Sequence, residues 1–182
     1  MNDKLSPALL LSMPQLRDPN FARTVVLLCD YVPEGAFGLV LNRPTELPAS
    51  TMVRLDPPVN ARNSLPLHFG GPVEPERGWL LVGEEPAGAE YRTVIDGLYL
   101  SRSPPLLRQV LESPAPQRAR IIAGYAGWGP GQLDGELAQS AWLMADVQLD
   151  LIFEVDPSLM WETAIRRMGA DPSTLHTSQG VH

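Results

Sequence analysis

The chain has 182 residues with a formal net charge of −7, and 44% of them are apolar while 19% are charged. This length and composition are typical of one folded domain with a sizeable core, and they argue against a disordered chain or two full domains. The acidic balance opposes long-range attraction to nucleic acid or to an anionic membrane. We therefore expect a single domain over residues 1–182, with no direct binding to nucleic acid and no association with a membrane.

The counts and positions of lysine, cysteine and histidine limit the kinds of active site that the chain can form. Thirteen arginines stand beside a single lysine, Lys4, so that Schiff-base chemistry and a P-loop lysine are close to excluded. The one cysteine, Cys29, lies in an apolar run and is interpreted as a buried thiol rather than a nucleophile. The histidines at 68, 176 and 182 do not have the spacing of metal ligands. The sequence therefore predicts neither a metal nor a cofactor.

The N-terminal apolar stretch, residues 7–13, is too short to span a bilayer. It follows Asp3-Lys4, and no small-residue cleavage site of a signal peptide comes after it. We expect a cytoplasmic protein.

Short apolar runs bounded by turn residues predict β-strands in the first two-thirds of the chain. These runs cover residues 9–13, 24–29, 37–41, 79–82, 92–95 and 98–100. Pro33-Glu34-Gly35 and Asp96-Gly97 predict two hairpins, so antiparallel pairing should prevail. Residues 44–66 are rich in proline and polar side chains, and they predict a surface excursion with at most one short helix near 50–55.

Helical periodicity begins later in the chain. Residues 104–113 show one apolar face behind Pro104-Pro105, and residues 132–142 show apolar positions every four residues, so both predict helices. Residues 120–123 predict a strand, and the alternation over 147–155 predicts a half-buried one.

A last helix is predicted to begin at Asp156 and Pro157 and to end before Gly169, ahead of a polar tail at about 172–182. Because the predicted hairpins come first in the chain and most of the predicted helices follow them, the sequence favours the α+β class. We expect a single compact domain in which a mixed, largely antiparallel, curled β-sheet is flanked by three or four helices.

The densest cluster of glycines is Gly124-Tyr-Ala-Gly-Trp-Gly-Pro-Gly-Gln-Leu133. Its third glycine comes one residue too early for a dinucleotide-binding fingerprint, and it lacks the lysine of a Walker A loop. An anion site at the start of the following helix stays open, although Asp134 and Glu136 already occupy that first turn. The alternative is a cramped turn. Likewise, Trp128 could stack on a flat ligand or fill the core beneath the loop.

A second glycine pair, Gly70-Gly71, follows His68, which is interpreted as a packed strand histidine with a catalytic base as the alternative. Arg43 and Arg77 could each bind an anion or pair with a carboxylate. We find neither a nucleophile motif nor a basic recognition helix for DNA.

Taken in order, several segments resemble the AlgH/YqgE family of small bacterial proteins. They are Ser12-Met-Pro-Gln-Leu16, Asp18-Pro-Asn-Phe-Ala-Arg-Thr-Val-Val26, Gly35-Ala-Phe-Gly-Leu-Val-Leu-Asn-Arg-Pro44, Gly70-Gly-Pro-Val73, Arg77-Gly-Trp79 and the glycine-rich run with Glu136, Leu137 and Trp142. The resemblance spans about residues 9–169 and implies a compact α+β fold with a mixed sheet. It implies no firmly established activity, although one branch is labelled a regulator of alginate-gene transcription.

Two hypotheses follow. The leading one is a non-enzymatic regulatory or interaction protein that acts indirectly, through an unknown protein or small-molecule partner. The alternative is a protein or weak enzyme that binds a small molecule, an anion or a nucleotide with the loop at 124–132. In either case the motif residues could line one shared surface. They are Asn42, Arg43, Gly70, Gly71, Arg77, Gly127, Trp128, Gly129, Gly131 and Gln132.

Overall fold

The computed structural model describes residues 5–16, 18–114 and 118–175. Their strands form a ten-stranded sheet whose main path runs β10-β1-β2-β3-β9-β6-β8-β7, with β5 pairing beside β9 and β4 pairing with β5. The strands are β1 (Ala8–Ser12), β2 (Val25–Val32), β3 (Gly35–Val40), β4 (Pro44–Pro48), β5 (Pro66–Phe69), β6 (Val73–Val82), β7 (Arg92–Ile95), β8 (Leu98–Ser101), β9 (Ala119–Trp128) and β10 (Trp142–Ala145). Only the pair β5–β9 is parallel among these described strands, which confirms a mixed, largely antiparallel sheet.

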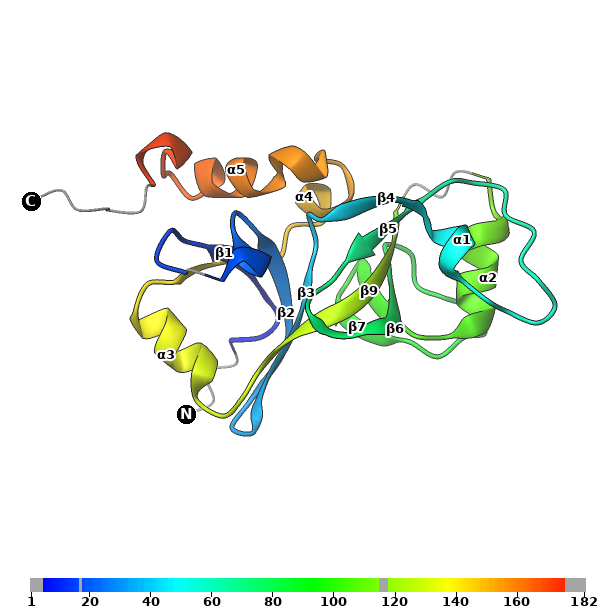
Figure 1. Cartoon of the computed structure of the whole chain (residues 1–182), viewed down its shortest axis with the longest axis horizontal. Helices are drawn as coiled ribbons and strands as arrows, with labels where there is room; N and C mark the ends of the chain where they lie inside the picture. The colour runs from blue at the N-terminus through cyan, green and yellow to red at the C-terminus, as the bar shows by residue number, and fades with distance from the viewer. Residues whose placement is uncertain (1–4, 17, 115–117, 176–182) are drawn as a thin grey trace, which may run out of the picture.

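The helices of the described residues are α1 (Ala49–Met52), α2 (Pro104–Glu112), α3 (Gln132–Ala138), α4 (Leu149–Phe153) and α5 (Pro157–Arg167), with 3-10 turns at Pro19–Phe21 and Pro172–Thr174. Figure 1 shows α3 and α2 at opposite ends of the molecule, with α4 and α5 along a third side and the sheet between them. This arrangement confirms the α+β class. None of the described helices has the length and apolar character needed to cross a membrane.

The central strands are buried on both faces. On β1, Leu9 and Leu11 pack in one core cluster with α5, whereas Leu10 packs in a second cluster with Leu133 of α3. Alternate side chains of a strand point to opposite faces, so a strand covered on both sides needs a continuous apolar run. A third cluster places α2 over β6 and β8.

Both predicted hairpins are present. Pro33-Glu34 joins β2 to β3, and Asp96-Gly97 joins β7 to β8 with Gly97 at φ +89°. The predicted helix at 104–113 is α2, and its N-cap Ser103 accepts a hydrogen bond from the backbone of Leu106. The last helix begins after Asp156, as predicted, and Gly169 at φ +84° follows its end.

The excursion at 44–66 contains a strand that was not predicted. Its first five residues form β4, which pairs with β5 at Pro44 and Pro48, and the short helix α1 follows directly. Prolines at both ends of β4 concealed it, because proline cannot donate to a sheet and is typical of edge strands.

The glycine-rich run is mostly a strand and not a turn, because β9 continues through Trp128 and only residues 129–131 turn. Close backbone contact explains these glycines. A Cβ on Gly124 would lie 2.4 Å from the carbonyl oxygen of Gly71, and one on Gly70 would lie 2.3 Å from that of Gly124. The two glycine-rich segments therefore pack backbone to backbone.

The helix predicted over 132–142 is shorter, because α3 ends at Ala138 and Trp142 begins β10. Ser140, at φ +57°, reverses the chain after the helix. Trp142 then pairs with Ser12 of β1. This pairing joins segments far apart in the chain, and helical spacing alone could not reveal it.

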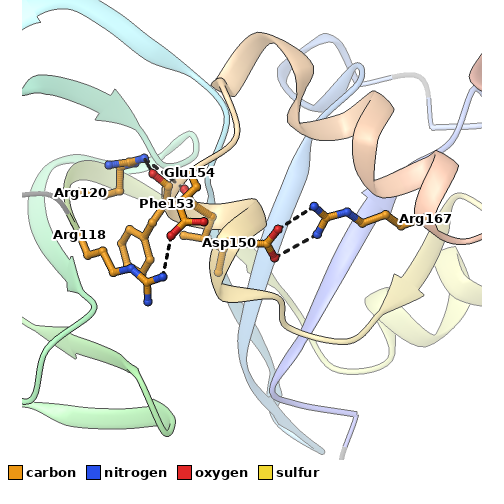
Figure 2. A network of polar contacts seen from close by, with 7 residues as sticks. Arg118, Arg120, Asp150, Phe153, Glu154 and Arg167 are labelled. Atoms are coloured by element: carbon orange, nitrogen blue, oxygen red, sulfur yellow. Dashed lines mark hydrogen bonds and ion pairs between the residues drawn. The ribbon is translucent and has the colours of Figure 1, made fainter.

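The half-buried strand predicted over 147–155 is wrong, since this segment contains the helical turn α4 (Figure 2). Leu151, Ile152 and Phe153 are buried in the core cluster that also holds side chains of β1, β2 and β3. The backbone must then close its hydrogen bonds within the turn or with side chains. Arg120 supplies two such bonds, to the carbonyls of Ile152 and Phe153 at 3.2 and 3.0 Å.

Ion pairs fix α4 at both ends (Figure 2). Arg118 contacts Glu154 at 2.8 Å, and Arg167 of α5 contacts Asp150 through two hydrogen bonds of 2.7 and 3.1 Å. The Arg167 guanidinium lowers the pKa of Asp150. Both pairs are partly exposed, so they orient the turn more than they stabilise the protein.

Candidate functional site

A cavity of about 530 Å³ opens where β3, β9, β6 and β8 lie side by side. We call it the aromatic–arginine cavity. The residues that line it are Asp30, Phe37, Arg77, Trp79, Glu90, Tyr91, Arg92, Leu100, Ser101, Arg102 and Tyr125.

Three aromatic rings form one wall of this cavity. Phe37 of β3 lies 4.9 Å from Trp79 of β6 and 5.1 Å from Tyr125 of β9, between ring centroids. Trp79 and Tyr125 meet edge to face at 6.2 Å. Because β9 lies between β3 and β6, residues far apart in the chain converge here. The cluster presents flat apolar surface to the cavity.

Three arginines also line the cavity, and two of them have carboxylate partners. Arg92 binds Asp30 at 2.7 Å and also donates to the carbonyl of Cys29, while Arg77 binds Glu74 at 3.0 Å. Asp30 raises the pKa of Arg92.

The guanidinium groups of Arg77 and Arg102 both lie over the Trp79 ring, at 5.9 and 5.2 Å from its centroid. Arg102 differs because it forms no ion pair with any described residue. It is exposed and charged, and a ligand could reach it.

Two further polar groups of the cavity form hydrogen bonds within the fold. The buried Ser101 hydroxyl donates to the carbonyl of Glu90 at 2.6 Å and accepts from the backbone of Ser103 at 3.0 Å. Desolvation and the hydrogen bond to Glu74 raise the pKa of Tyr125, which keeps its phenol neutral. The described residues of the lining include two carboxylates, Asp30 and Glu90, but no histidine, cysteine or lysine.

Residues 9–173 match the model of the AlgH-like family. The chain belongs to this family. It is 40% identical to a UPF0301 protein of Myxococcus xanthus, with 98% of both chains covered. It is 41% identical to one of Methylococcus capsulatus, covering 95% of this chain and 93% of the relative.

Solved structures agree with this membership. The solution structure of the AlgH protein from Pseudomonas aeruginosa aligns with a TM-score of 0.78 at 32% identity, covering 100% of this chain and 97% of the other. A crystal structure of a protein from Corynebacterium diphtheriae aligns with a TM-score of 0.68 at 22% identity over 96% and 91%, a likeness of fold alone. The resemblance to the AlgH/YqgE family and the fold class are thereby confirmed.

The structure distributes the predicted site residues of this AlgH-like chain over separate places. Arg77 lines the aromatic–arginine cavity, whereas Asn42 and Arg43 line a different cavity beside α5. Gly70 and Gly71 are buried where their backbone packs on β9.

The predicted residues at 127–132 lie on the path from β9 into α3. The Trp128 side chain is buried, at 6% exposure, and its Nε1 donates to Glu136 at 2.8 Å. The side chain of Gln132 accepts from the backbone of Gly129 at 3.0 Å, and Gly131 at φ +74° leads into α3. These side chains therefore form hydrogen bonds within the segment itself. A binding role for the loop at 124–132 stays a prediction.

Among the described residues that line the cavity, only Arg77 was a predicted site residue. Phe37, Trp79 and Tyr125 stand inside the motif segments, so their aromatic character at strand positions was an available signal. Arg102 follows a predicted strand without any motif around it, and only the fold places it above Trp79.

Two residues with reactive side chains, His68 and Cys29, are buried. His68 is a packed strand histidine with 3% of its surface exposed, and both ring nitrogens lack a partner among the described residues. Burial, followed by the Arg120 charge, lowers its pKa to about 4, so the ring is neutral near pH 7. Cys29 is buried, as expected, and burial raises the pKa of its thiol to about 12.

Proposed function

We propose that this AlgH-like protein binds a small planar anion in the aromatic–arginine cavity and acts as a non-enzymatic regulatory protein. The observation that carries the proposal is Arg102, whose unpaired guanidinium lies 5.2 Å above the Trp79 ring. The proposal retains small-molecule binding but locates it away from the loop at 124–132.

The ligand class follows from the two kinds of surface in the cavity. Guanidinium groups bind carboxylates and phosphates through paired hydrogen bonds, and aromatic walls accept the face or edge of a ring. The volume of about 530 Å³ lies within the range of about 300 to 1,000 Å³ typical of small-molecule sites. An aromatic carboxylate or a phosphate ester of a flat ring meets both requirements.

The regulatory role rests on the groups of the cavity and on the charge of the chain. Of the two cavity carboxylates, that of Asp30 is held by Arg92, and the Ser101 hydroxyl both donates and accepts a hydrogen bond, which supports binding without turnover. A net charge of −7 favours an indirect action through a partner over direct readout of DNA. Ligand occupancy would then be the signal that a cytoplasmic partner detects.

A thermal-melt screen of aromatic carboxylates and phosphate esters tests the binding. A ligand at a hundredfold excess over its Kd stabilises the protein by about 2.7 kcal/mol, because it binds only the folded chain. Arg102→Gln should weaken such a ligand about tenfold or more, since it removes a charged hydrogen-bonding partner.

The matched control is Arg54→Gln, which removes the same charge from an exposed residue outside the cavity. Equal affinities of the two variants, or a screen in which no compound shifts the melting temperature, would contradict the proposal. Partner capture compared with and without the ligand would test the regulatory role.

A further inference from the structure

A second cavity, of about 240 Å³, lies between the ends of two strand segments and the start of α5. Its lining includes Arg23, Asn42, Arg43, Ser158, Trp161 and Glu162. None of these residues lines the aromatic–arginine cavity. We propose that Arg23 and Arg43 form a separate binding site here for a compact oxyanion, a phosphate or carboxylate group.

Hydrogen bonds hold the two arginine segments together. The Asn42 side chain accepts from the backbone of Val25 and donates to the carbonyl of Arg23, both at 3.0 Å. The Arg43 guanidinium donates through Nη2 to the carbonyl of Ala22, the residue directly before Arg23. Arg43 thus extends alongside the backbone that carries Arg23, with its other N–H groups available to a ligand.

The Arg23 side chain is oriented by an aromatic ring. Its guanidinium lies 4.9 Å from the centroid of Trp161, and that indole is buried and donates to the carbonyl of Ser12 at 2.9 Å. Because the ring is fixed, the guanidinium stacked on it loses less freedom when it binds an anion.

The charges at this cavity leave a positive excess. Neither Arg23 nor Arg43 forms an ion pair with any described residue, and Glu162 is the one carboxylate among the lining residues. Two guanidinium groups and one carboxylate line this cavity, and an oxyanion would offset the excess positive charge.

The α5 N-terminus is not the basis of the site, because the Asp156 side chain already accepts from the backbone and hydroxyl of Ser158. The volume of about 240 Å³, and a lining in which Trp161 is the one aromatic side chain among the described residues, limit the ligand to a compact group.

The test follows the side-chain NMR signals of Arg23, Arg43 and the Trp161 indole during titration of the full chain. Inorganic phosphate and acetate are the two probes, with ionic strength held constant by sodium chloride. We expect saturable shifts confined to these signals. Tighter binding of phosphate would assign the site to phosphate groups, and tighter binding of acetate to carboxylates.

Arg23→Gln and Arg43→Gln should each weaken binding about tenfold or more, and Glu162→Gln should strengthen it. Arg62→Gln, at an exposed position away from the cavity, is the matched control and should bind as the unmodified chain does. If Arg43→Gln fails to fold, Arg23→Gln still tests the proposal, because Arg23 is exposed and its replacement should leave the fold intact. Shifts that do not saturate, or equal affinities in all variants, would overturn the proposal.

Discussion

At the scale of single residues, His68 combines deep burial with unpartnered ring nitrogens. It lies on β5, opposite Ile122 of β9 and Pro44 of β4, and the charge of Arg120 also opposes its protonation. An imidazole in this position is neutral in the folded chain but takes up a proton readily when the chain unfolds.

We therefore expect His68→Leu to make the protein less sensitive to acid. The folded pKa of about 4 lies below the ordinary value of 6.5, so the unfolded chain binds the proton first as the pH falls. Between these values His68 lowers the free energy of unfolding by at most about 1.4 kcal/mol per pH unit.

Urea denaturation at pH 6.5 and at about pH 4 measures this difference. The variant should match or exceed the stability of the unmodified chain at the higher pH, because no polar atom is left unsatisfied. It should then lose less stability on acidification. Identical losses in both proteins would show that His68 is protonated without penalty in the fold.

At the scale of elements, α3 is attached to two strands by one carboxylate. Glu136 accepts from the indole nitrogens of Trp128 on β9 and Trp142 on β10, both at 2.8 Å. The two rings meet edge to face at 6.0 Å. The short helix thereby gains specific contacts that its propensity alone would not provide.

Glu136→Ala should lower the free energy of unfolding by about 2 to 4 kcal/mol, because two partly buried indole N–H groups lose their acceptor. Glu84→Ala removes the same charge from an exposed loop and serves as the control. Urea unfolding followed by tryptophan fluorescence measures both. A loss no greater than that of the control would mean that water replaces the carboxylate at both indoles.

Some helices and strands can be predicted from their local sequence, whereas others cannot. The strands β1, β7 and β8 and the helices α2 and α5 carry local signals, such as apolar runs, Asp-Gly turns and capping residues. The segment of α4 alternates like a strand, yet it lies on a face of the sheet where a helical turn satisfies its backbone. The local pattern of apolar residues does not predict against which part of the fold a segment packs.

At the scale of the whole molecule, β9 connects the parts of the sheet. It pairs with β3, β5 and β6, and Figure 1 shows it running through the centre of the fold towards α3. At Gly124 its backbone lies directly against the backbone of Gly71.

Gly124→Ala should destabilise the whole sheet in one transition. The new Cβ would lie 2.4 Å from the carbonyl oxygen of Gly71, at a φ of +81° that non-glycine residues rarely adopt. We expect a loss of about 2 kcal/mol or more. Hydrogen exchange should quicken in β1 and β2 as well as in β6 and β8.

Gly88→Ala separates the two causes, because Gly88 has a φ of +71° but no atom within 4 Å of its Cβ position. The control should show only the smaller effect of the positive φ. Equal losses in both variants would mean that the backbone contact at Gly124 relaxes without difficulty.

The sequence by itself determined the family, the α+β class, both hairpins and the ends of α2 and α5, because runs, turns and caps act between residues close in the chain. Only the tertiary structure decided that residues 44–48 and Trp142 join the sheet, since strand pairing depends on distant partners. It also decided which side chains share a cavity. Phe37, Trp79, Arg102 and Tyr125 meet because β3, β9, β6 and β8 lie side by side, an order that no local spacing encodes.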